Sequence, residues 1–230
     1  MAETRIHFHQ ALGTLKELLI EMGGKTERVI DLAIGGYLSR DSTLCSEVLA
    51  IEKEINLVER RIDEFALELL ASEQPMAGDL RLITACMKIN SDLERVGDQA
   101  ANIARRGLAE IGLPRVELPV DIPRIAAAAA GMIRRALNAF IEKDADLAYA
   151  VLKMDDIVDR MDNDAWKNLV RRMHEEPAVI EQALDALIVV RNLERVADHA
   201  TNIAEDVIFW VRGTDVRHGF GSVASIEDER

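Results

Sequence analysis

Two stretches of twelve residues, one hundred positions apart, decide the fold of this chain. Leu93–Ala104 reads LERVGDQAANIA and Leu193–Ala204 reads LERVADHATNIA, and nine of the twelve residues are identical. An internal repeat of this kind indicates a duplicated structural unit. In both copies the apolar residues recur at helical spacing, so each copy is expected on a helix. The chain is therefore expected to consist of two related helical halves.

Breaks in the helical pattern occur at corresponding places in the two halves. Arg40-Asp41-Ser42 marks the first break of one half and contains a candidate N-cap, and Lys143-Asp144 marks it in the other. Loops over 72–78 and 175–177 form the second break of each half, and Gly23-Gly24 is a candidate kink. Each half is thus predicted to be an antiparallel three-helix bundle. The predicted helices cover residues 5–38, 43–71, 79–107, 122–141, 145–173 and 177 to about 211.

A proline-containing stretch separates the halves. Residues 107–123 hold three of the five prolines, which is typical of a linker. We expect a first three-helix bundle over 1–110, a linker over 111–121, a second three-helix bundle over 122–213, and a loose tail over 214–230. The predicted fold class is all-α, with two tandem antiparallel three-helix bundles related by internal duplication.

The composition favours helix and disfavours several classes of function. Apolar residues make up 49% of the 230 residues but aromatic residues only 4%, and good helix formers dominate. The net charge of −13 argues against nucleic-acid binding and is compatible with cations or a basic partner. The longest uncharged helical run, 125–133, is too short to span a bilayer, and the amino terminus lacks a secretory signal pattern. Cys45 and Cys86 are expected in the core of a reduced, cytoplasmic protein.

Each copy of the repeat carries a stripe of oxygen-bearing side chains. A Glu and an Asp stand four residues apart and an Asn follows four residues later, which places all three on one side of a helix. Like charges at this spacing cost a helix about 0.2–0.5 kcal/mol, so a duplicated acidic pair suggests a compensating positive charge. The stripes are Glu94, Asp98 and Asn102 in the first copy, and Glu194, Asp198 and Asn202 in the second.

The preceding helix of each half offers matching groups. In the second half Asp155 and Asp159 are four residues apart, and the equivalent positions in the first half are Glu52 and Asn56. Two such stripes on neighbouring helices could gather oxygen ligands within about one helical turn. An all-oxygen site suits Mg²⁺, Mn²⁺, Ca²⁺ or oxidised iron. Because Asn56 is uncharged, the first half is predicted to bind metal less strongly than the second.

Salt bridges are the main alternative explanation of these stripes, and spacing alone does not separate the two. Zinc of the usual kind is disfavoured because neither His nor Cys recurs at the stripes, and His199 is expected at a surface or an interface. A di-iron oxidase is disfavoured because the chain has no Glu-x-x-His. The candidate arginines are Arg60, Arg61, Arg81, Arg95, Arg191 and Arg195.

No catalytic nucleophile or phosphate-binding loop stands out in the sequence. The sequence lacks Gly-x-Ser-x-Gly, P-loop and HExxH patterns. Two alternatives stay open. Paired carboxylates in a helical bundle can hold Mg²⁺ for a phosphohydrolase or pyrophosphatase, and a purely structural helical scaffold would use the stripes as solvated faces.

These motifs together resemble the PhoU family. The resemblance lies in SDLERVGDQAANIA and RNLERVADHATNIAED within tandem halves, supported by QPMAGDLRLITACMKINSDLERVGD and VIFWVRGTDVRH, and covers residues 5–218. It implies two three-helix bundles side by side and surface-bound multinuclear clusters of iron or zinc. The implied ligands are Glu94 and Asp98 in the first half, and Asp155, Asp159, Glu194 and Asp198 in the second, with Glu52 and Asn56 in the remaining pair.

The same resemblance implies a regulatory role without chemistry. Members of the family act as cytoplasmic adaptors that report phosphate sufficiency from the phosphate-specific ABC transporter to a membrane sensor histidine kinase. The result is repression of phosphate-starvation genes and restraint of phosphate uptake. The implied partners are the transporter ATPase subunit, the kinase and a second copy in a homodimer, with no nucleic acid and no direct membrane insertion.

Overall fold

The computed structural model describes residues 2–72 and 75–217. Within these residues the chain forms seven α-helices and one short 3₁₀ helix, and no strand. The elements are α1 (Ala2–Ser39), α2 (Ser42–Ser72), α3 (Ala77–Ala109), α4 (Ile122–Glu142), α5 (Ala145–Leu152), α6 (Asp155–Glu175), η1 (Pro177–Val179) and α7 (Ile180–Arg212).

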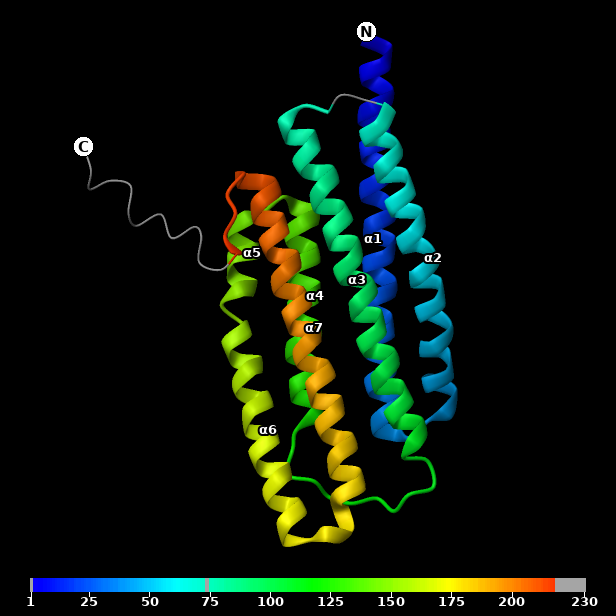
Figure 1. Ribbon diagram of the computed structural model, residues 1–230, viewed down its shortest axis with the longest axis vertical. Helices are drawn as coiled ribbons and strands as arrows, with labels where there is room; N and C mark the ends of the chain where they lie inside the picture. The colour runs from blue at the N-terminus through cyan, green and yellow to red at the C-terminus, as the bar shows by residue number, and fades with distance from the viewer. Residues whose placement is uncertain (1, 73–74, 218–230) are drawn as a thin grey trace, which may run out of the picture.

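Two helical bundles lie side by side (Figure 1). One consists of α1, α2 and α3, and the other of α4, the α5–α6 pair and α7. The bundles meet where α3 packs against α7 and α1 packs against α4. The all-α prediction of two tandem three-helix bundles is confirmed, and the two copies of the repeat lie on the paired helices α3 and α7.

A single apolar core runs through both bundles. The apolar residues of the repeat belong to it, since Leu93, Val96, Leu193 and Val196 have no exposed surface. Burying apolar surface stabilises a fold by about 25 cal/mol per Å². This stripe therefore fixes how α3 and α7 face the core, and the carboxylates next to it must lie at the edge of that core.

The first break has the same construction in both halves, as the duplication predicts. Arg40 and Lys143 adopt left-handed backbone conformations, with φ of 58° and 55°. The aspartate that follows each of them caps the next helix. Asp41 Oδ1 accepts hydrogen bonds from two backbone N–H groups at 2.7 and 3.2 Å, and Asp144 Oδ1 does so at 2.8 and 3.0 Å.

The single helix predicted over residues 145–173 is wrong, because the structure divides it into α5 and α6 at Lys153-Met154. The Met154 N–H bonds to the carbonyl oxygen of Val151 at 2.9 Å, three residues back, which interrupts the α-helical ladder. Asp155 and Asp156 then occupy the first turn of α6, where the positive end of the helix dipole favours carboxylates. The break thus places Asp155 at a helix N-terminus, unlike its counterpart in the uninterrupted α2.

Other predicted boundaries shift by a few residues. The loop predicted over 72–78 is shorter, since α3 begins at Ala77, and residues 73–74 lie outside the described residues. Pro177 begins the 3₁₀ helix rather than α7. Of the predicted tail, residues 218–230 also lie outside the described residues.

The helix α1 runs without interruption through Gly23-Gly24. A helix can bend without losing its α-helical conformation, so the expected kink stays a prediction. A Cβ atom at Gly23 would lie 2.9 Å from a methyl carbon of Leu137, so α1 and α4 pack closely there. Cys45 and Cys86 are buried free thiols, as predicted. Among the described residues no helix has both the length and the apolarity to cross a membrane.

Candidate metal centre

Helices α6 and α7 bring four carboxylates together, which we call the second-half cluster: Asp155, Asp159, Glu194 and Asp198. Asp155 and Glu194 are half-buried, and Asp159 and Asp198 lie at the exposed edge. One oxygen of Asp155 and one of Glu194 are buried without a hydrogen-bond partner. A buried acceptor without a partner is unfavourable, so protein groups alone do not complete this cluster.

The pKa values of the second-half cluster are raised. Partial burial raises the pKa of Asp155 to about 6, and repulsion from Asp159 and Asp198 adds to the effect. Burial likewise raises the pKa of Glu194 to about 7, with Asp198 adding and Arg191 opposing. The pKa of Asp198 is raised by partial burial and then by Asp159. Burial and mutual repulsion therefore both disfavour the ionised forms of these carboxylates, and a bound cation would offset the repulsion.

The equivalent first-half cluster on α2 and α3 consists of Glu52, Asn56, Glu94 and Asp98. The Asn56 amide donates a hydrogen bond to Glu52 Oε1 at 2.7 Å, and its Oδ1 atom is buried without a partner. The pKa of Glu94 is raised by partial burial and then by Asp98, and that of Asp98 by partial burial and then by Glu52. The first half thus has the same kind of site with one negative charge fewer.

Arginine accounts for only part of this charge. Of the six candidate arginines, Arg191 is the one whose ion pair with a cluster carboxylate is present among the described residues. Its Nη1 atom lies 2.9 Å from Glu194 Oε1 and 3.4 Å from Asp162 Oδ2. Arg81, by contrast, donates to the carbonyl oxygen of Trp210. The salt-bridge explanation therefore applies to Glu194 and leaves the other carboxylates of the clusters unexplained.

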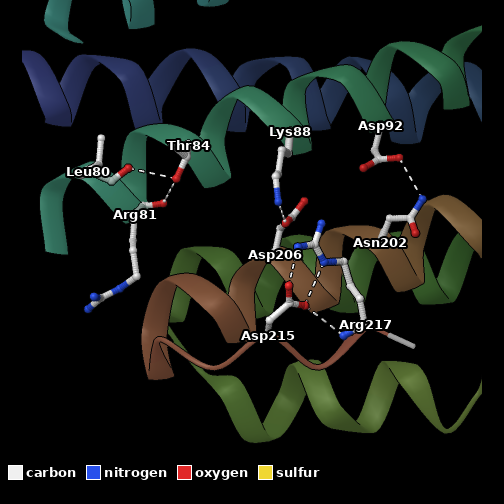
Figure 2. A network of polar contacts seen from close by, with 9 residues as sticks. All are labelled: Leu80, Arg81, Thr84, Lys88, Asp92, Asn202, Asp206, Asp215 and Arg217. Atoms are coloured by element: carbon white, nitrogen blue, oxygen red, sulfur yellow. Dashed lines mark hydrogen bonds and ion pairs between the residues drawn. The ribbon is translucent and has the colours of Figure 1, made fainter. Parts of the chain in front are cut away.

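The two predicted asparagines of the stripes have partners outside the clusters. Asn102 Oδ1 accepts a hydrogen bond from Arg105 at 2.7 Å. The Asn202 amide donates to Asp92 Oδ1 at 3.2 Å, across the contact between the bundles (Figure 2). His199 Nδ1 lies 2.8 Å from the same Asp92 oxygen, so His199 is an interface residue. A role for either asparagine as a metal ligand stays a prediction.

Ion pairs between α3 and α7 were not predicted from the sequence. Lys88 Nζ lies 2.9 Å from Asp206 Oδ1, as Figure 2 shows, and Arg106 Nη1 lies 3.2 Å from Asp185 Oδ1. Both aspartates are buried. Their signal in the sequence is a charged residue within an otherwise apolar helical stripe, which indicates a polar contact between packed helices.

Both halves of the chain match one known protein family. Residues 19–107 and 122–207 match the PhoU domain. The chain belongs to the PhoU family. It is 43% identical over 216 residues to the phosphate-specific transport system accessory protein PhoU homolog of Pseudomonas aeruginosa, covering 92% of this chain and 88% of that protein. It is 32% identical over 211 residues to the phosphate-specific transport system accessory protein PhoU of Escherichia coli, covering 92% and 88%.

Solved structures of PhoU proteins have the same fold. The crystal structure of PhoU from Pseudomonas aeruginosa superposes with a TM-score of 0.85 at 41% identity, over 90% of this chain and 100% of that one. PhoU from Streptococcus pneumoniae gives a TM-score of 0.84 at 25% identity, over 91% and 99%. The PhoU arrangement of two bundles is thus retained at low sequence identity.

Two further acids of this PhoU-family chain extend the clusters beyond the predicted residues. Glu59 follows Glu52 by seven residues and Asp162 follows Asp155 by seven, which places each on the same side of its helix. Repulsion from Glu59 contributes to the raised pKa of Glu94, and Asp162 contributes to that of Glu194. The heptad spacing was visible in the sequence and could have identified both residues.

The chemistry of the clusters fits the metal ions that the PhoU family implies, although the present side-chain positions do not form a ready-made site. Within residues 2–72 and 75–217, no three His, Cys, Asp or Glu side chains converge to hold a metal ion. The donors are oxygens, several lack partners, and their charge is only partly compensated, which suits a hard cation. The metal sites remain a prediction.

Proposed function

We propose that this protein is a non-enzymatic regulator of phosphate uptake and phosphate signalling. The observation that carries the proposal is the match of both halves to the PhoU domain. Relatives that share most of its length are named accessory proteins of the phosphate-specific transport system. By this proposal the protein associates with such a transport system and restrains it when phosphate is sufficient.

At the level of partners, the protein would be an adaptor between the transporter ATPase subunit and a membrane sensor histidine kinase. Long helical faces can dock against other proteins, and a net charge of −13 suits partners with basic surfaces. The adaptor would act as a homodimer in the cytoplasm and reach the membrane through its partners. Its signal would repress phosphate-starvation genes.

The two clusters would bind metal ions as part of this role. Iron or zinc is implied by the family, and Mg²⁺, Mn²⁺ or Ca²⁺ by the oxygen ligands. In the second half the ligands would be Asp155, Asp159, Glu194 and Asp198. In the first half they would be Glu52, Glu94 and Asp98 with the Asn56 amide oxygen. The ion would offset the carboxylate repulsion and fix neighbouring helices relative to each other.

The regulatory role can be tested in a phosphate-sensing bacterium that lacks its own PhoU gene. Expression of this chain is expected to restore repression of a phosphate-starvation reporter in phosphate-rich medium. Binding of the purified protein to the ATPase subunit and to the cytoplasmic part of the kinase would be measured in parallel by biolayer interferometry. Failure to repress, together with failure to bind either partner, would contradict the proposal.

The hydrolase alternative makes a different prediction, namely metal-dependent release of phosphate from pyrophosphate or nucleotides. Arg191, the arginine that contacts the second-half cluster, is already engaged by Glu194 and Asp162 rather than free to bind a phosphate, and this favours the non-enzymatic role. Purified protein with Mg²⁺ or Mn²⁺ is expected to release no phosphate above a control without protein. Turnover that disappears in a Glu194→Gln variant would contradict the non-enzymatic assignment.

A further inference from the structure

One position next to the duplicated acidic pair differs between the halves. Arg191 precedes Glu194 by three residues, and the equivalent position in the first half is Ser91, three residues before Glu94. Side chains three residues apart on a helix are neighbours on its surface. The second-half cluster therefore has a cation built into its own helix, where the first half has a hydroxyl.

The guanidinium of Arg191 occupies a position between carboxylates of two helices. Its Nη1 atom lies 2.9 Å from Glu194 Oε1 on α7 and 3.4 Å from Asp162 Oδ2 on α6. A metal ion that used these carboxylates would need the same oxygens, since an ionised carboxylate is the shared ligand of both cations. The pairing is also partial, because Glu194 Oε2 is buried without a partner.

The Arg191 side chain is exposed enough to be displaced from its ion pairs with Glu194 and Asp162. Its side chain is 58% exposed, whereas that of Glu194 is 12% exposed. Ion pairs with one partner this exposed contribute little to stability. Arg191 also lines an open surface pocket of about 520 Å³ together with Trp166 and Ile188. A displaced guanidinium could therefore lie near an indole ring, which attracts cations.

We infer that Arg191 is a tethered counter-ion of the second-half cluster, which competes with metal ions for Glu194 and Asp162 and is displaced when a metal binds. The inference rests on the proposed metal binding. It also changes which cluster is expected to bind metal more strongly. The second half has one more carboxylate than the first, but this charge is offset by the competing Arg191. In the first half Ser91 provides no such competitor.

The test uses Mn²⁺ as the probe and isothermal titration calorimetry of the full chain after chelator treatment. The parent for this comparison carries Glu94→Gln and Asp98→Asn, so that only the second-half cluster binds. In this background Arg191→Ser is expected to lower the Kd for Mn²⁺ by about 3- to 5-fold, since a partly exposed ion pair no longer has to be broken. Circular dichroism would verify that each variant is folded.

Two comparisons make the test specific to Arg191. Arg195→Ser removes the same charge one turn further along α7, where the arginine is exposed, and is expected to change the Kd by about twofold at most. The reciprocal Ser91→Arg variant is made with Asp155→Asn and Glu194→Gln, so that only the first-half cluster binds. Introducing the competitor there is expected to raise the Kd for Mn²⁺ by about 3- to 5-fold.

The possible results separate this inference from the proposed metal binding. If the parent binds Mn²⁺ and Arg191→Ser leaves its Kd unchanged, the counter-ion inference is overturned and metal binding stands. If Arg195→Ser tightens binding as much as Arg191→Ser, the effect is general electrostatics and the inference is also overturned. If neither parent nor any variant binds Mn²⁺, both the inference and the proposed metal binding fail.

Discussion

The two carboxylate clusters have the same scaffold but neutralise their charge differently. In the first half, Asn56 takes the place of a carboxylate and donates a hydrogen bond to Glu52. In the second half, Asp159 keeps the charge and Arg191 offsets part of it through Glu194. After a duplication, the buried apolar stripe must keep its pattern because it holds the helices together. The partly exposed residues beside it can diverge, and these set the charge of each site.

The contact between the bundles shows a similar divergence. Asp92 on α3 accepts hydrogen bonds from His199 and Asn202 on α7. At the equivalent positions, the Asn192 amide turns back to a carbonyl of its own helix, and Gln99 Oε1 is buried without a partner. Asp92 therefore forms hydrogen bonds across the interface, whereas the equivalent residue Asn192 does not.

The largest predicted effect comes from neutralising the second-half cluster. The Asp155→Asn, Glu194→Gln variant is expected to lower the Mn²⁺ affinity of this cluster by at least about tenfold, because affinity depends on ligand charge. Without metal the same variant should be more stable than wild type, with a Tm about 2–4 °C higher, because repulsion is removed. Calorimetry and thermal unfolding in chelator measure the two effects.

Asp164→Asn is the control for that variant, since Asp164 is an exposed acid of α6 outside the cluster. It is expected to change neither quantity measurably. A double variant that binds Mn²⁺ like wild type, or that unfolds at a lower temperature without metal, would contradict the assigned role of these carboxylates.

A smaller effect is expected from making the first half resemble the second. Asn56→Asp replaces the hydrogen bond to Glu52 with repulsion, which should destabilise the metal-free protein by about 1 kcal/mol. The substitution also adds one ligand charge to the first-half cluster, which should tighten Mn²⁺ binding there by roughly several fold. Measuring both in the Asp155→Asn, Glu194→Gln background isolates this cluster. Weaker binding would show that Asn56 is not at the metal position.

The raised pKa values predict how stability without metal depends on pH. The folded-state pKa is about 6 for Asp155 and about 7 for Glu194, against ordinary values of 3.8 and 4.5. The folded protein therefore binds more protons than the unfolded chain between these values, and its unfolding free energy falls as the pH rises through them. In chelator, Tm is expected to decrease from about pH 5 to about pH 8 by a few degrees more in wild type than in Asp155→Asn, Glu194→Gln. Equal slopes in the two proteins would be inconsistent with these pKa values.

The smallest predicted effect is at the bundle interface. His199→Gln removes one hydrogen bond to Asp92, which still accepts one from Asn202, and should reduce stability by about 0.5 kcal/mol. The reciprocal Gln99→His variant introduces histidine where the equivalent partner is Asn192, and it should not gain the same amount. Thermal unfolding of both variants compares the two positions. An unchanged Tm in His199→Gln would show that the Asp92–His199 contact contributes nothing.

The sequence predicted those parts of the fold that depend on local patterns. The repeat located α3 and α7, and the Asp41 and Asp144 breaks follow from ordinary N-cap chemistry. The division between α5 and α6 was missed because no proline or glycine marks Lys153-Met154. Adjacent acids at Asp155 and Asp156 were the available sign of a new helix N-terminus.

For the candidate site, the sequence placed the cluster residues on facing helices but did not show which charges are compensated. Six arginines were candidates. Arg191 lies three residues before Glu194 on the same helix, but only the packing of α6 against α7 shows that it also reaches Asp162. The sequence also predicted that Asn202 lies beside Asp198 on the same stripe. In the structure its amide instead donates a hydrogen bond to Asp92 on the other bundle. Contacts between distant segments depend on tertiary packing, which the spacing within one helix does not contain.

Elemental analysis tests most directly whether the duplicated carboxylates are metal sites. Untagged wild-type protein, purified without chelators, would be measured beside a variant with Asp155, Asp159, Glu194 and Asp198 all changed to Ala. We predict bound iron, zinc or manganese in the wild type and loss of the second-half share of that metal in the folded variant. No metal in the wild type, or the same metal content in both proteins, would contradict the account.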